Sequence, residues 1–263
     1  MSRRSVNYDA VAPDYDQRTR QGSYLADIPL ALQDLVRQVQ AGRLLDLGCG
    51  TGRSLLGLAY GLQPSPRLYG LDFSAGMLAQ ARRLDPAYRL TQASAPFPPF
   101  ATASFDLVFC VHAFHHFPDK VQVIRAAYDI LRPGGVLAII NIDPHACQPG
   151  DWWVFDTFEG VRETDLQRFP SLAQQETMLR EAGFVQINSP IVQYIDECVS
   201  GEAIFDNYWL CKDSCSQLIL LSVEAYQAGV KRLRRRLAQA KAAGETVTFR
   251  TRLENRMCHG FKL

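Results

Sequence analysis

The chain has 263 residues, 47% of them hydrophobic, and its 28 basic and 27 acidic side chains leave a net charge of +1. This length allows a sizeable core, and the charge balance excludes a global field that attracts nucleic acid or anionic lipid. Seven cysteines without paired C-x-x-C spacing favour reduced thiols, and no apolar run approaches the ~20 residues of a membrane span. We expect one cytoplasmic domain over residues 1–263, because no signal-peptide core follows the start.

Apolar residues at helical spacing in residues 25–39 predict a helix before the first strand. Strand and helix patterns then alternate, with strands expected at 44–47, 67–72, 88–92, 105–111 and 136–141. Such alternation of apolar strands with helices predicts an α/β fold, with a mostly parallel sheet covered by helices on both faces.

The most informative stretch is residues 44–52, where an apolar run reaches Asp46 and then a loop containing Gly48, Gly50 and Gly52. These alternate glycines match neither the G-x-G-x-x-G of dinucleotide sites nor the phosphate loop. A second apolar run ends in Asp72, twenty residues after Gly52, where a carboxylate accepts hydrogen bonds from ribose hydroxyls. The spacing predicts a ligand with a ribose but no diphosphate. An ordinary strand-to-helix turn and a helix-capping Asp72 are the structural alternatives.

Four motifs in order resemble the class I S-adenosylmethionine (SAM) dependent methyltransferases, in particular the broad type 11 group that methylates small molecules. They are residues 44–52, 71–78, 105–108 and 131–135. The resemblance implies a Rossmann-like fold with a seven-stranded sheet, a SAM-binding core at 41–143, and an N-terminal lid and first helix at 1–40. Residues 8–16 are similar to the segment that closes over SAM in that family.

The resemblance also assigns a cofactor site. In it, Asp46 hydrogen-bonds the loop or a water near the methionine end, and Gly48 and Gly50 let the backbone meet the ligand. Asp72 meets the ribose, and residues beside Asp72 sandwich the adenine. Ser94 and Ala95 stand where the family often has an acidic residue. The expected cofactor-binding residues are Tyr15, Asp46, Gly48, Cys49, Gly50, Asp72, Phe73, Met77, Ser94, Ala95 and Val111. Core packing is the alternative for Phe73 and Met77, and plain amphipathic packing is the alternative for Tyr15.

Three histidines, His112, His115 and His116, follow the fourth predicted strand. Because open α/β sheets bind ligands beyond the carboxyl ends of their strands, His112 is the candidate catalytic base. His115 and His116 are interpreted as packing residues, since the family often has a similar pair there. Spacing shows neither a fourth ligand nor a supporting carboxylate, so no metal site is expected.

The second half interrupts the alternation twice. Residues 144–170 form an aromatic insertion, and we expect four of its side chains to line the acceptor pocket: Trp152, Trp153, Phe155 and Phe158. Sealing of the insertion against the core is the alternative. A capping box at Ser171 opens a helix to 182, strands are expected at 185–187, 191–195 and 246–250, and 196–243 is a predicted helical cap.

Two further patterns carry weaker alternatives. Cys198, Cys211 and Cys215 are interpreted as small buried thiols rather than a soft-ligand site. The basic run at residues 231–236 is interpreted as a solvated helix face.

The sequence therefore predicts an enzyme that transfers a methyl group from SAM to a nucleophilic O, N, S or C atom of a small molecule by in-line displacement. Nucleic acid and membrane partners are not expected, and the oligomeric state is left open. The alternatives are a methyltransferase acting on RNA or protein and a SAM-binding partner protein without catalysis.

Overall fold

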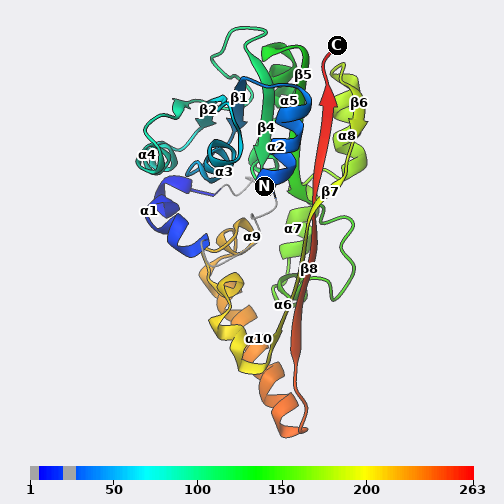
Figure 1. Cartoon of the computed structure of the whole chain (residues 1–263). Coiled ribbons are helices and arrows are strands. Elements are labelled where there is room, and N and C mark those ends of the chain that lie inside the picture. The colour runs from blue at the N-terminus through cyan, green and yellow to red at the C-terminus, as the bar shows by residue number, and fades with distance from the viewer. Residues whose placement is uncertain (1–5, 20–27) are drawn as a thin grey trace.

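The computed structural model describes residues 6–19 and 28–263, and an eight-stranded sheet runs through it (Figure 1). The strand order is β3-β2-β1-β4-β5-β8-β6, and β7 pairs with β8 beside this path. The strands are β1 Arg43–Leu47, β2 Arg67–Asp72, β3 Arg89–Gln92, β4 Phe105–Val111, β5 Leu131–Ile142, β6 Val185–Asn188, β7 Ile191–Ser200 and β8 Thr248–Phe261. β1 to β5 are parallel, whereas β8 is antiparallel to β5, β6 and β7. The predicted mostly parallel α/β sheet is confirmed, with one strand more than the seven that the resemblance implied.

Helices cover both faces of the sheet because successive side chains of each strand point to opposite sides. On β4, Leu107 and Phe109 belong to the core that packs against α2 Ile28–Gln38 and α3 Arg53–Gly61. Val108 and Cys110 belong to the opposite core, against α5 Lys120–Ile130 and α8 Leu172–Glu181. The predicted capping box at Ser171 is present at the start of α8. Of the first predicted helix, residues 25–27 lie outside the described residues.

Two further helices, α1 and α4, lie at one end of the sheet. α4 spans Ala75–Leu84 and follows β2 directly, so its N-terminus lies at the carboxyl edge of the sheet. α1 spans Tyr8–Thr19 and packs against α4. The side chain of Asp9 holds this contact, since its Oδ1 accepts from Ser74 Oγ at 2.6 Å and from Gly76 N at 2.8 Å.

The two C-terminal strands β7 and β8 extend beyond the sheet as a long antiparallel arm (Figure 1). The predicted strand at 246–250 is only the beginning of β8, which continues to Phe261. The predicted helical cap at 196–243 also starts too early, because β7 runs through Ser200. Between the strands lie η3 Gly201–Asp206, η4 Tyr208–Leu210, α9 Ser216–Ile219 and α10 Val223–Ala242, and α10 lies along the arm.

A third hydrophobic core fills the space between the arm and the insertion, where α6 Trp153–Thr157 and α7 Val161–Arg168 lie. Trp152, Trp153 and Phe158 are at most 3% exposed within it, and Phe155 packs against it half-buried. Gly229 of α10 makes close packing possible, because a Cβ there would come within 2.2 Å of the Phe158 ring. The insertion is therefore sealed to the fold by its own aromatic side chains.

Among the helices of residues 6–19 and 28–263, none combines the length and apolar character needed to cross a membrane.

We predict that Trp152→Ala lowers the free energy of unfolding by about 3–5 kcal/mol, because it empties a buried site in the third core. Tyr194→Ala is the matched control, since the Tyr194 side chain on β7 is 68% exposed and its loss should cost about 0.5 kcal/mol or less. Urea unfolding of both variants measures the difference. Equal losses in the two variants would contradict the sealing role of Trp152.

Candidate active site

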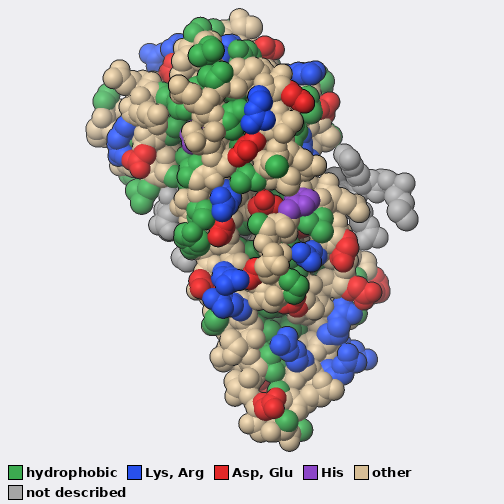
Figure 2. All heavy atoms as spheres, turned by 90° about the vertical axis from the view of Figure 1, so that its right-hand side faces the viewer, with side chains coloured by type: hydrophobic (Ala, Val, Ile, Leu, Met, Phe, Trp, Pro, Cys, Tyr) green, Lys and Arg blue, Asp and Glu red, His purple; other side chains and the backbone are tan. Residues whose placement is uncertain are grey.

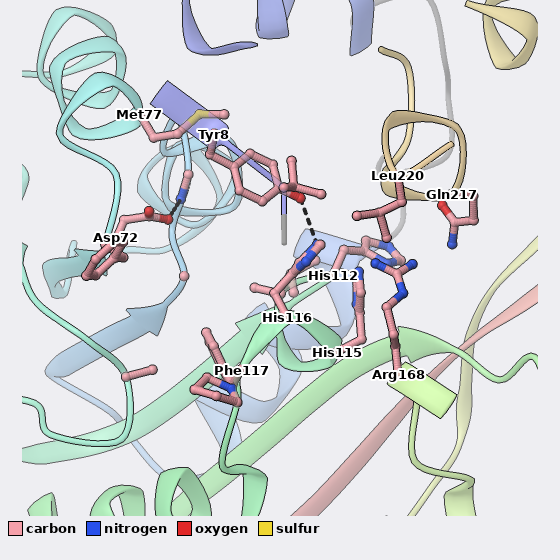
Figure 3. A pocket seen from close by; sticks show the side chains of 18 of the residues that line it. Tyr8, Asp72, Met77, His112, His115, His116, Phe117, Arg168, Gln217 and Leu220 are labelled. Carbon is pink, nitrogen blue, oxygen red and sulfur yellow. Dashed lines mark hydrogen bonds between the residues drawn. The ribbon is translucent and has the colours of Figure 1, made fainter. Parts of the chain in front are cut away.

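A cavity of about 1540 Å³ opens at the carboxyl ends of β1, β2 and β4. One half is bounded by the glycine loop, the start of α4 and α1 (Figure 3). The other half is bounded by the histidine segment, α7, α9 and the start of α10. Pockets for single small ligands measure roughly 300–1,000 Å³, so this cavity has room for two.

All eleven residues expected at the cofactor line this cavity, and so does His112. They are Tyr15, Asp46, Gly48, Cys49, Gly50, Asp72, Phe73, Met77, Ser94, Ala95, Val111 and His112. The structure thus brings together in one cavity side chains that are up to 97 positions apart in the sequence, from Tyr15 to His112.

The glycine loop is held against the end of β2. Gly48 N and Cys49 N both donate to Leu71 O, at 2.7 and 3.0 Å, and Gly50 N donates to Asp72 Oδ2 at 2.9 Å. Gly48 and Gly50 have φ values of 78° and 51°, a backbone conformation in which residues other than glycine are strained. A Cβ on Gly48 would lie 2.5 Å from that of Ala113, whereas Gly50 faces open space. The loop therefore exposes bare backbone to the cavity at Gly50.

Asp72 ties this loop to α4. Its second oxygen, Oδ1, accepts from Ser74 N at 2.8 Å. Ser74 is the N-cap of α4, with its own Oγ accepting from Met77 N, so Asp72 itself does not occupy the capping position. Burial raises the pKa of Asp72, and the hydrogen bonds from Ser74 and Gly50 oppose that shift. Each carboxylate oxygen retains acceptor capacity for a ligand hydroxyl.

Asp46 lies deeper in the same half. It is 2% exposed, and its Oδ1 has no hydrogen-bond partner among the described residues. Burial raises the pKa of Asp46 well above its usual value, and the charge of Asp72 adds to the shift. A buried carboxyl oxygen without a donor costs about 1–3 kcal/mol, so a ligand or water that donates to it would stabilise the site.

The side chains beside Asp72 divide between rim and wall. Phe73 is 77% exposed at the cavity rim, which excludes core packing for it, whereas Met77 is 2% exposed and belongs to the wall. Ala95 in the same lining is buried, and Ser94 is half-buried. An exposed aromatic face next to a carboxylate suits stacking on a planar base.

The histidine segment forms the wall between the two halves. His112 has a φ of 50°, strained for a residue with a side chain, and its N–H donates to Ile140 O at 2.9 Å. Burial lowers the pKa of His112 to about 4 and that of His116 to about 3, the latter with help from the charges of Arg168 and Lys120. Burial also lowers the pKa of His115 well below its usual value. All three rings are therefore neutral at physiological pH.

His115 and His116 make specific polar contacts as well as packing. The ring of His115 stacks on Phe169 with centroids 4.0 Å apart, and its Nε2 lies 3.3 Å from Ser216 Oγ. His116 Nε2 lies 2.7 Å from the hydroxyl of Tyr8, which joins α1 to this wall (Figure 3). The interpretation of the pair as packing residues is thus incomplete.

The side of the cavity opposite α1 contains a polar network that sequence reasoning missed. Arg168 Nη2 donates to Asp165 Oδ1 at 2.6 Å and to Ser216 Oγ at 3.1 Å. Gln217 Nε2 donates to Asp165 Oδ2 at 2.8 Å. The available signal was the i, i+3 pair of Asp165 and Arg168 in a helix whose sequence has little apolar periodicity.

The four aromatic residues expected at the acceptor are not in the lining of this cavity. Trp152, Trp153 and Phe158 lie in the third core, and Phe155 faces a separate hollow of about 260 Å³ beside Gln148 and Arg162. The expectation is corrected for a physical reason: large apolar rings gain most from full burial, and the third core provides it. Polar residues of α7 and α9, rather than these aromatic residues, line the cavity.

Comparisons with known proteins agree with this geometry. A family described as a methyltransferase domain matches residues 45–139. The chain is similar to demethylmenaquinone methyltransferases: 28% identical to that of Lactiplantibacillus plantarum, over 69% of this chain and 87% of the relative. The identity to that of Thermus thermophilus is 34%, over 52% of this chain and 64% of the relative.

Among solved structures, the fold is similar to that of Haemonchus contortus phosphoethanolamine N-methyltransferase 2 in complex with S-adenosyl-L-methionine. The TM-score is 0.59 at 21% identity, over 97% of this chain and 57% of the other. The matched methyltransferase domain contains the glycine loop and Asp72, and the relatives and the fold support a SAM-dependent methyltransferase similar to those that methylate small molecules.

Proposed function

We propose that the chain transfers the methyl group of SAM to a small molecule bound in the half of the cavity formed by His112, α7, α9 and the start of α10. The single observation that carries this proposal is the continuity of the cavity. It contains the expected cofactor residues at one end and a separate, partly apolar wall with Val161, Leu220 and Leu221 at the other.

The described residues fit SAM in three respects. The unpartnered Oδ1 of Asp46 offers an acceptor, Gly50 leaves open space above the loop, and Asp72 has acceptor capacity for ribose hydroxyls. Phe73 and Met77 provide the faces between which an adenine would lie. When bound, SAM supplies an electrophilic methyl group on a positively charged sulfur.

The chain's own contribution is alignment and exclusion of water. Displacement at a methyl group needs a nucleophile in line with the leaving sulfur, and holding both reactants removes much of the entropic cost. α1 bounds one half of the cavity, fixed by Asp9 to α4 and by Tyr8 to His116. α7 and α9 bound the other half.

His112 is the residue we assign as proton acceptor. It follows β4 directly, lines the cavity, and carries a neutral ring because burial lowers its pKa to about 4. In this role the acceptor's O–H or N–H bond breaks as the new bond to the methyl carbon forms, and the imidazole takes the proton.

The two alternative functions, methylation of RNA or protein and SAM binding without catalysis, would require different structural features. A methyltransferase acting on RNA needs an extended basic surface. Over the described residues visible in Figure 2, basic and acidic side chains are interspersed, with no broad patch of one sign. A SAM-binding partner protein without catalysis needs no acceptor half, and the large second half of the cavity favours an enzyme.

Isotope transfer tests the function directly. With methyl-labelled SAM and a pool of cellular metabolites, we expect label in one or a few small molecules, dependent on active protein. Label in RNA or protein alone would contradict the small-molecule acceptor. Tight SAM binding without any labelled product would favour the partner protein.

Asp72→Ala should weaken SAM binding at least about tenfold, because a hydrogen bond to a charged group contributes about 1.5–3 kcal/mol. Asp72→Asn, which keeps one acceptor oxygen, should lose less. Asp34→Ala is the control, since the Asp34 side chain is 78% exposed on α2. Calorimetry with SAM and with NAD measures both affinity and choice, and tighter binding of NAD would contradict the cofactor assignment.

The assignment of His112 predicts a distinctive pH profile. Because the base form predominates above a pKa of about 4, turnover should stay level from neutral pH down to about 5 and then fall. An ordinary histidine would already lose half its base form near pH 6.5. His112→Ala should lower turnover about a hundredfold with SAM affinity kept. His259→Gln is the control, because His259 is outside the cavity lining. Unchanged turnover in His112→Ala would contradict the assignment of His112 as the base.

A further inference from the structure

The wall of the acceptor half offers hydrogen-bond donors but few free acceptors. Its polar network consists of Asp165, Arg168, Ser216 and Gln217, joined to His115. This imbalance bears on the chemical class of the acceptor, and the argument rests on the function proposed above.

Asp165 cannot bind a cationic ligand in this arrangement. It is 0% exposed, its Oδ1 accepts from Arg168 and its Oδ2 accepts from Gln217. The amide oxygen of Gln217 is also engaged, 3.4 Å from Ser216 Oγ. The acidic group of the network is therefore used internally to orient Arg168 and Gln217.

Arg168, by contrast, has donors to spare. Among the described residues its hydrogen bonds involve Nη2 only, and Nε is buried without a partner. A guanidinium carries five N–H donors, and its planar shape suits oxygen anions. The side chain is 15% exposed, lines the cavity and extends alongside His115 (Figure 3).

The position of Arg168 is fixed from both sides. The next residue, Phe169, is 3% exposed and stacks on His115, and the guanidinium carbon lies 5.5 Å from the centroid of the Phe169 ring. The guanidinium is therefore held at the wall rather than free to swing into solvent.

The surrounding charges favour an anion over an ammonium group. The positive charge of Arg168 contributes, after burial, to the lowered pKa of His116. Lys120 adds a second cation to this part of the lining, with its Nζ donating to Phe117 O at 3.0 Å, and Glu159 at the rim pairs with Arg232 at 3.3 Å. Arg53 follows the glycine loop and therefore lies in the cofactor half. Asp46 and Asp72 belong to the cofactor half.

We propose that Arg168 binds an anionic oxygen of the methyl acceptor, as found in a carboxylate or an ionised phenol, and thereby selects anionic acceptors over amines. Asp165 then acts as a positioning residue that holds the guanidinium, and Gln217 holds Asp165.

The test uses four aromatic probes of similar size: benzoate, 4-nitrophenolate, benzamide and benzylamine. Each is titrated into protein saturated with S-adenosylhomocysteine, and affinity is measured together with the NMR signal of Arg168 Nε. We expect at least one of the two anions to bind and to shift that signal, and Arg168→Gln to weaken its binding about tenfold or more. Binding of benzoate alone identifies a carboxylate site, and binding of 4-nitrophenolate alone identifies a site for ionised phenols.

Matched variants separate recognition from folding. The double variant Asp165→Asn with Arg168→Gln removes both charges together, so no lone carboxylate is left buried, and it should lose the anion to the same extent. Arg168→Lys keeps the charge and should retain part of the affinity. Arg250→Gln, which breaks an ion pair with Asp196 on the arm, should change nothing.

Two results would overturn the proposal. One is an anion affinity that Arg168→Gln leaves unchanged. The other is binding of benzamide or benzylamine to the unaltered protein as tight as that of the better-bound anion, or no binding of either anion to the protein saturated with S-adenosylhomocysteine. Failure of S-adenosylhomocysteine to bind at all would instead count against the proposed function, and the probes can then be titrated without it.

Discussion

The carboxylate of Asp72 is the contact on which the cofactor half of the cavity depends. One oxygen accepts from Gly50 N and the other from Ser74 N, so a single side chain at the end of β2 fixes both the glycine loop after β1 and the start of α4. The parallel register of β1 and β2 makes this possible, since it places Leu47 beside Leu71 at the same edge. Asp46, close by and buried, is left with an unpartnered oxygen that a ligand or water can satisfy.

The half of the cavity that we propose for the acceptor depends on a different part of the molecule, the third core. Phe158 stacks on Tyr226 of α10, and the Tyr226 hydroxyl donates to Leu210 O at 2.6 Å. Val161 anchors the start of α7 in the same core. These contacts hold α7 and α9 over the histidine segment, so aromatic residues that do not line the cavity still determine its shape. Packing supports the wall, and its surface combines polar residues of α7 and α9 with the apolar side chains of Val161, Leu220 and Leu221.

The residues expected at the cofactor could be grouped from the sequence because the signals they carry are local. Glycine spacing and an acidic residue at a strand end depend on backbone conformation within a few residues, and the residues expected there do line one cavity. The four aromatic residues expected at an acceptor lie in or against the third core instead, because hydrophobicity alone does not distinguish a pocket from a core, as Trp152 shows. α7 escaped notice because a helix that turns polar residues toward a cavity lacks a strong apolar period. The full length of β8 was readable, since arginines and glutamate alternate with buried residues from Phe249 to Met257.

Hydrogen exchange with and without S-adenosylhomocysteine tests most directly the central claim, that the loops tied by Asp72 form the cofactor half. The account predicts slower exchange at residues 46–54 and 71–78 on binding, with no change in the arm at residues 194–200 and 248–254, which lie outside the cavity lining. Protection that appears on the arm, or is absent from the glycine loop while the ligand is bound, would contradict it.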